Sequence, residues 1–78
     1  MPITLEQAKT LKVGTILYHI INKNVDGSPQ RWKVNGKVKT WKRDASKVSI
    51  PLKHGLRQFD YLNEHALHLV CLNEEEAK

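Results

Sequence analysis

Short runs of β-branched and aromatic residues, separated by turn-forming residues, constrain this chain more than any other feature. "TILYHIIN" is apolar on both faces and predicts a central strand, and "NKNVDGSP" after it collects loop-forming residues. "VSIPLK" alternates, with Val48, Ile50 and Leu52 on one face. "LRQFDYL" and "LHLVCL" predict further strands, and Phe59 and Tyr61 share one face of the first. The chain therefore predicts a mainly β domain of five or six short antiparallel strands.

Capping residues predict two helical segments. Thr4 is followed by Gln7 ahead of apolar residues at helical spacing, which is a capping box that opens a short N-terminal helix. Asn63 can cap a single helical turn before the last strand. Pro51 cannot donate a hydrogen bond to a neighbouring strand, so we expect its strand to lie at a sheet edge or to carry a bulge there.

A chain of 78 residues can bury one small core, so we expect a single domain over 1–73 and an acidic C-terminal tail over 74–78. The predicted elements follow one another in a definite order. A helix, a glycine and the first strand in "LKVGTILYHI" come first, then a long loop and a basic central hairpin, and finally a one-turn helix before the last strand in "LNEHALHLVCL". This order resembles the SH3-like small barrels over nearly the whole chain, in architecture rather than in a motif. The resemblance implies a closed or nearly closed antiparallel barrel. In style the chain also resembles short proteins of phages and prophages.

The sequence favours a cytoplasmic protein. Cys71 is the only cysteine, which excludes a disulfide within one chain and fits a reducing compartment. The N-terminal residues lack a basic segment followed by an apolar run, so they predict no signal peptide. The longest apolar stretches are far shorter than the roughly 20 residues that a membrane-spanning helix needs. We therefore expect no membrane partner.

Positive charge is concentrated in the middle of the chain. Residues 30–57 carry nine lysines and arginines against Asp44, whereas residues 1–29 have a net charge of +1 and residues 58–78 a net charge of −4. The stretch "QRWKVNGKVKTWKR" alone holds six of these cations and both tryptophans, without an acid. A basic region of this kind favours polyanions such as DNA or RNA, while the acidic end opposes indiscriminate binding.

The basic stretch predicts a hairpin, because Asn35-Gly36 is a strong turn signal. A two-residue loop would mix apolar and charged residues on both faces. A three-residue loop over Val34, Asn35 and Gly36, with Gly36 left-handed, separates them and is preferred. The buried face of the hairpin then holds Trp32, Val38 and Thr40.

The other face of this hairpin is the candidate binding site. Trp41 is expected to be exposed there, where an indole can stack on a base or a sugar. The cations around it would contact phosphates, with little sequence preference. The candidate residues for nucleic acid, or for an acidic protein partner, are Arg31, Lys33, Lys37, Lys39, Trp41, Arg43, Lys47 and Lys53. Lys42 and Arg57 are candidates to extend this set.

Other interpretations of the basic face remain open. The leading alternative is a protein-interaction module that binds an acidic partner surface, related to phage–host contact or to assembly. A structural subunit that uses a sheet edge is a third, and a solvated hairpin with no partner is a fourth. Trp41 would then pack only over the stems of neighbouring lysines.

We expect no enzyme activity, because no arrangement of residues predicts catalysis. The chain lacks the glycine-rich nucleotide motifs GxxxxGK[ST] and GxGxxG, and Cys71 lies in an apolar strand where a thiol is usually inert. His65 and His68 are spaced for one helix face but lack a third ligand, and His19 is expected to be a core histidine. We therefore expect no metal, no cofactor and no small-molecule substrate.

Overall fold

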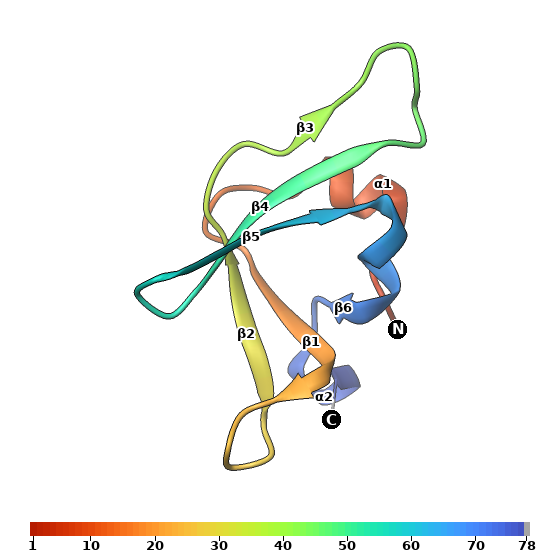
Figure 1. The fold of residues 1–78 in the computed structure, drawn as a ribbon. Coiled ribbons are helices and arrows are strands. Elements are labelled where there is room, and N and C mark those ends of the chain that lie inside the picture. Colours follow the sequence, from red (N-terminus) through yellow and green to blue (C-terminus); the bar gives the residue numbers. More distant parts are fainter. Residues whose placement is uncertain (78) are drawn as a thin grey trace.

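The computed structural model describes residues 1–77, which form one antiparallel sheet with three helical segments (Figure 1). The strands are β1 (Ile16–Lys23), β2 (Pro29–Val34), β3 (Lys39–Thr40), β4 (Val48–His54), β5 (Gln58–Asn63) and β6 (Val70–Cys71). The helical segments are α1 (Leu5–Lys9), the 3-10 helix η1 (Glu64–Leu69) and α2 (Glu74–Ala77). β6 pairs with β1, β1 with β2, and β4 with β2, β3 and β5. The predicted mainly β fold of five or six antiparallel strands is confirmed, and the structure has six. A closed barrel is not, because the sheet stays open between β5 and β6.

Both predicted helix caps are present. The Thr4 hydroxyl accepts a hydrogen bond from the Gln7 N–H at 3.1 Å, and the Gln7 side chain accepts one from the Thr4 N–H at 2.9 Å. At the start of η1, the Asn63 side chain accepts from the His65 N–H at 3.0 Å. These bonds satisfy N–H groups that have no partner within the helix, which is why the cap residues can be recognised from sequence.

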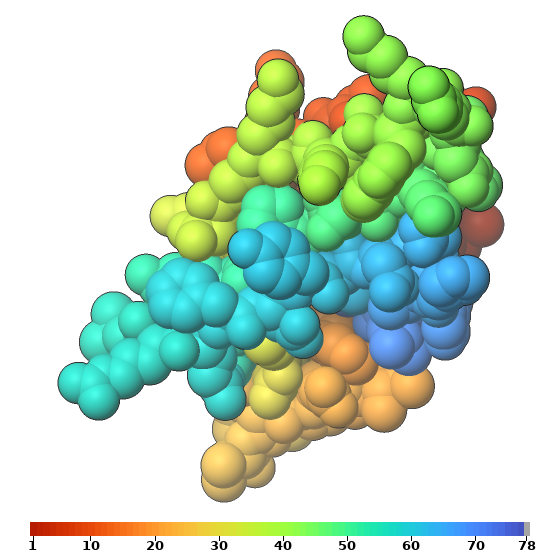
Figure 2. Space-filling model, turned by 45° about the horizontal axis from the view of Figure 1, so that its top comes forward, coloured from red at the N-terminus to blue at the C-terminus, as the bar shows by residue number. Residues whose placement is uncertain are grey.

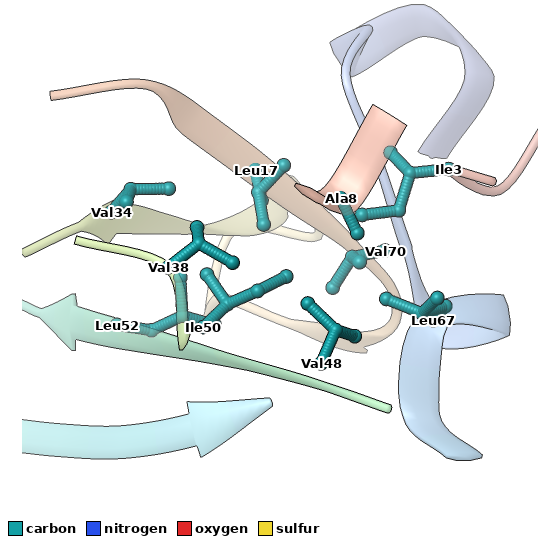
Figure 3. Close-up of a cluster of buried hydrophobic side chains, with 10 residues drawn as sticks. All are labelled: Ile3, Ala8, Leu17, Val34, Val38, Val48, Ile50, Leu52, Leu67 and Val70. Carbon is teal, nitrogen blue, oxygen red and sulfur yellow. The ribbon is translucent and has the colours of Figure 1, made fainter. Parts of the chain in front are cut away.

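The alternating apolar residues of β4 form the centre of the core (Figure 3). Val48, Ile50 and Leu52 are buried, as the sequence predicts, and they pack with Leu17 of β1 and Val34 of β2. Apolar residues from the N-terminal segment, α1, the β2–β3 connection, η1 and β6 complete the cluster: Ile3, Ala8, Val38, Leu67 and Val70.

β2 and β3 are two halves of one interrupted strand rather than the arms of a hairpin. Both pair with β4, where Val34 lies opposite Leu52 and Lys39 lies opposite Ser49. Four residues, 35–38, therefore stand opposite two residues of β4, 50–51, as in an extended β-bulge. The predicted hairpin with a three-residue loop is wrong.

Burial of two valines explains why the chain does not turn back at Asn35-Gly36. Val34 is fully buried and Val38 is 9% exposed, so both ends of the connection are held in the core. Withdrawing one of them would cost about 1.5–3 kcal/mol of apolar burial. Gly36 does not adopt the predicted left-handed conformation. It lies against Pro51 instead, and a Cβ at Gly36 would be 3.2 Å from Cγ of that ring.

Pro51 lies in an interior strand, so of the two settings predicted for it, a sheet edge or a bulge, the edge is wrong. Its carbonyl accepts a hydrogen bond from the Asn35 N–H at 2.9 Å. The nitrogen and the carbonyl of one strand residue point toward the same neighbouring strand. The nitrogen of Pro51, which carries no hydrogen, therefore faces the interrupted segment 35–38, where the regular pairing is broken. The irregularity that accommodates Pro51 therefore lies in the segment opposite it, residues 35–38, and not in β4 itself.

The C-terminal part is more structured than the sequence predicts. The 3-10 helix η1 continues to Leu69, which leaves only Val70 and Cys71 in β6 where a strand over 67–72 was expected. Residues 74–77 form α2, in which Ala77 is buried and accepts a hydrogen bond from the Lys23 side chain. The expected solvated tail is therefore held in part against β1.

Candidate functional site

The sheet register places four of the predicted cations on the side of the sheet that faces away from the core, called here the outer face. Directly opposed residues of antiparallel strands point to the same side. Lys33 of β2 lies opposite Lys53 of β4, and Lys39 of β3 lies opposite Ser49 of β4. Since side chains alternate along a strand, Ser49 and Lys53 share a side, and so do Arg31 and Lys33. Four cations from three strands therefore lie on one face.

Two aromatic side chains lie beside these lysines, and a third lies on the same face of the sheet. The Lys39 Nζ is 5.2 Å from the centre of the Trp41 ring, and the Lys53 Nζ is 5.6 Å from the centre of the Phe59 ring. Tyr61 follows Phe59 on the same side of β5. The exposed fractions of Trp41, Phe59 and Tyr61 are 37%, 61% and 72%. Figure 2 shows β5 (cyan to blue) next to the yellow-green and green residues of the β2–β3 and β3–β4 segments on one surface.

Phe59 and Tyr61 are absent from the set of residues predicted from sequence. Their shared face is visible in the alternation of "LRQFDYL", but that alternation does not indicate that the face lies beside Lys53. The missing signal is the short turn at 55–57, which puts Phe59 directly opposite Lys53 and Tyr61 opposite Pro51. Reading that turn together with the strand alternation would have added both rings to the candidate site.

The three outer-face lysines have no acidic partner among the residues that the structure describes. Arg31 forms an ion pair with Glu74 of α2 at 3.9 Å, between groups that are both partly exposed. Within residues 1–77, Lys33, Lys39 and Lys53 form no such pair. The positive charge of these three lysines is therefore available to an anion from outside the protein.

The remaining predicted cations lie outside the strands. Lys37 is exposed in the β2–β3 connection, and Arg43 and Lys47 are exposed in the β3–β4 loop, so the sheet register does not place them on the outer face. Asp44 in that loop accepts hydrogen bonds from the Ser46 hydroxyl at 2.5 Å and from the Ser46 N–H at 3.1 Å. These bonds, and to a smaller extent the nearby Lys47, lower the pKa of Asp44. The loop thus contains a fixed negative charge between its cations.

A cleft of about 170 Å³ opens where the sheet is not closed, between β1, β5 and η1. Trp32 forms part of its wall and stacks on His54, with ring centres 4.9 Å apart and an angle of 29° between the planes. The Trp32 Nε1 is buried, and the described residues supply no hydrogen-bond partner for it. Trp32 packs against the core as predicted, whereas Thr40, which was expected to share its buried face, is exposed.

His19 has a structural role at the edge of this cleft. Its Nδ1 accepts hydrogen bonds from the backbone N–H groups of Ile21 at 3.1 Å and Asn22 at 2.8 Å, where the register of β1 with β2 shifts. Burial of the imidazole and, secondarily, the charge of Lys23 lower the pKa of His19. The neutral ring is therefore favoured, which is the form that can accept both bonds.

Comparisons with protein-family models, with curated proteins and with solved structures find no match for this chain. Among residues 1–77, no helix is long and apolar enough to cross a membrane. Over the same residues, no three side chains of the kinds that bind metal ions lie together. Function must therefore be inferred from the outer face itself.

Proposed function

We propose that this chain is a nonenzymatic module that binds nucleic acid through its outer face, with little sequence specificity. The observation that supports this best is the set of three lysines, Lys33, Lys39 and Lys53, which form no ion pair with a described acid. Two of them lie beside exposed aromatic rings. Ammonium groups and rings side by side suit a ligand that alternates charged phosphates with flat bases.

Binding would proceed mainly through phosphate contacts. Each lysine that neutralises a phosphate releases condensed counterions, so affinity depends steeply on salt. Contacts of this kind carry no sequence information. Trp41 adds a ring on which any base can stack, beside the ammonium group of Lys39. The exposed cations of the connections, Lys37, Arg43 and Lys47, would extend the electrostatic attraction beyond the sheet.

The order of elements supports an SH3-like origin for the fold, as an open rather than a closed small barrel. The strands follow one another as an antiparallel meander up to β5, and a 3-10 turn then leads to a last strand that pairs back with β1. We also propose a cytoplasmic location, from the single cysteine, Cys71.

An acidic protein surface is the second candidate ligand. The ion pair between Arg31 and Glu74 is an example of a cation of the outer face that pairs with a carboxylate. Exposed aromatic side chains are also common anchors in protein interfaces. The two candidates differ in what they require, because a carboxylate-bearing partner offers no bases for the rings to stack on.

Fluorescence anisotropy with labelled DNA and RNA oligonucleotides tests the nucleic-acid proposal. We expect binding at about 50 mM salt that weakens at about 200 mM. For three phosphate contacts, the slope of log K against log salt should be about −2 for a single strand and about −2.7 for a duplex. Lys39→Glu should reduce the affinity and flatten the slope. Lys12→Glu makes the same change of charge outside the strands and should have a much smaller effect.

Failure to bind any DNA or RNA at low salt would overturn the proposal. Equal losses of affinity for Lys39→Glu and Lys12→Glu would show that the net charge, rather than the outer face, is responsible. A titration with polyglutamate under the same conditions tests the second candidate. Binding of polyglutamate without binding of nucleic acid would favour an acidic protein partner.

A further inference from the structure

We infer that the outer face binds single-stranded rather than double-stranded nucleic acid, with Phe59 and Tyr61 of β5 as its stacking platform. This inference rests on the proposed function and specifies the class of nucleic acid. It adds two residues that the charge pattern does not reveal.

The first observation is the exposure of both rings. Phe59 and Tyr61 are 61% and 72% exposed, whereas the apolar residues of β4 on the core side are buried. Both rings belong to a regular strand, so neither is placed outside the core by an irregular loop. Two large rings that remain in water within a regular strand are typical of a binding surface.

The second observation is the spacing of the rings. Residues two apart on one strand lie roughly 7 Å from each other, at about 3.4 Å per residue. One strand of a B-form duplex advances about 3.4 Å per nucleotide. Neighbouring bases stacked on Phe59 and Tyr61 therefore cannot also stack on each other. The platform suits an extended strand whose bases are separated.

The third observation is the position of the positive charge. The Lys53 Nζ lies 5.6 Å from the Phe59 ring, and Lys33 is directly opposite Lys53 on β2. A phosphate next to a base on Phe59 would therefore meet one or both ammonium groups. Lys39 of β3 and Trp41, the residue that follows β3, form a second pair of a cation and a ring. Alternation of rings and cations matches the alternation of bases and phosphates along one strand.

A duplex would use this face poorly. Its bases are stacked and paired inside, so a sheet face meets mainly phosphates and sugars. The lysines would still bind, but the rings of Phe59 and Tyr61 would lose contact with water without gaining a base. The rings thus favour the single strand, while the charges do not discriminate.

The test compares a labelled single-stranded 12-mer with the duplex of the same sequence, by anisotropy at about 50 mM salt. We expect the single strand to bind at least about tenfold more tightly. In the double variant Phe59→Leu and Tyr61→Leu, single-strand affinity should fall at least about tenfold, since base–aromatic stacking contributes substantially per base. Duplex affinity should change less than about twofold. Leu56→Ala, an exposed apolar residue in the β4–β5 turn, is the control and should leave both affinities unchanged.

Each outcome separates this inference from the proposed function. If the duplex binds as tightly as the single strand, or if the leucine variant binds the single strand normally, the inference is overturned and the proposed function stands. If neither form binds at low salt, both are overturned. Because both rings are exposed, the double variant should keep its cooperative urea transition, and that transition verifies that any loss of affinity is not a loss of fold.

Discussion

Lys33 and Lys53 lie directly opposite each other on β2 and β4, so two like charges are in register across adjacent strands. Like charges in this arrangement are destabilising. The described residues provide no acid to neutralise either lysine. A chain selected only for stability would gain by replacing one of them, so this pair is a place where stability and binding should conflict.

Lys33→Glu tests that conflict. The substitution converts the cross-strand repulsion into an attraction with Lys53, and should raise the free energy of unfolding by about 0.2–1 kcal/mol in urea titrations. The same variant should bind nucleic acid more weakly at every salt concentration. Lys12→Glu is the charge-matched control and should leave both quantities nearly unchanged. A loss of stability in Lys33→Glu would contradict the register of β2 with β4.

Trp32 and Trp41 should differ sharply in their contribution to stability. Trp32 packs against the core, and Trp32→Ala should reduce the free energy of unfolding by about 3 kcal/mol. Trp41→Ala should cost less than about 1 kcal/mol, because its ring is partly exposed and contacts Lys39. Chemical denaturation of both variants measures the difference. Similar costs would mean that the two rings do not lie on opposite sides of the sheet.

Trp32→Phe gives a finer test of the same ring. The Trp32 Nε1 is buried and has no hydrogen-bond partner within residues 1–77, which carries a desolvation penalty that phenylalanine does not have. The loss of ring area is therefore partly offset, and Trp32→Phe should cost far less than Trp32→Ala. Chemical denaturation measures the cost of Trp32→Phe against the unmodified chain. Because little ring area is lost, a cost above about 2 kcal/mol would contradict an unpaired N–H and show that the indole forms a hydrogen bond that phenylalanine lacks.

The stability of the protein should fall in mild acid because of His19. The pKa of His19 is lowered in the folded state, whereas in the unfolded chain it is about 6.5. The unfolded state therefore binds more protons below about pH 6.5, so the contribution of His19 is complete above that pH and is lost as the pH falls. His19→Asn keeps an acceptor near the position of Nδ1 but cannot be protonated. Urea titrations at pH 5 and pH 7.5 should show a smaller pH dependence for this variant.

The cap of η1 can be tested by two substitutions of Asn63, one that truncates the side chain and one that is isosteric with it. Asn63→Ala removes the acceptor for the His65 N–H and should cost about 1 kcal/mol. Asn63→Asp keeps an acceptor oxygen at the same place and should cost little. If both substitutions destabilise equally in thermal unfolding, the cap bond does not contribute.

Local features of this fold could be predicted from sequence, and long-range pairing could not. Thr4 and Asn63 were recognised because a cap bonds to N–H groups two or three residues away. The burial of β4 followed from strict alternation. The pairing of β3 with β4 rather than with β2 could not be read in this way, because Asn35-Gly36 has the local signature of a turn. Burial of Val34 and Val38 opposes that turn, and burial depends on the rest of the chain.

The same distinction between local features and long-range pairing applies to the residues of the candidate site. The exposure of Arg31, Lys33 and Lys39 follows from their charge, and it was predicted. The rings of β5 were not assigned to the site, because their nearness to Lys53 depends on the register of β5 with β4. Register is set by the turn and by the buried residues together, so it had to come from the structure.

The interrupted strand has a practical consequence for redesign. Because both halves pair with β4, that single strand sets the distance between Lys33 and Lys39, and the connecting residues 35–38 do not. Lengthening this connection next to the exposed Lys37 should therefore leave the two anchoring points where they are. A short peptide tag or a reporter group inserted there would lie between the two halves of the outer face, with Val34 and Val38 still buried on either side of it.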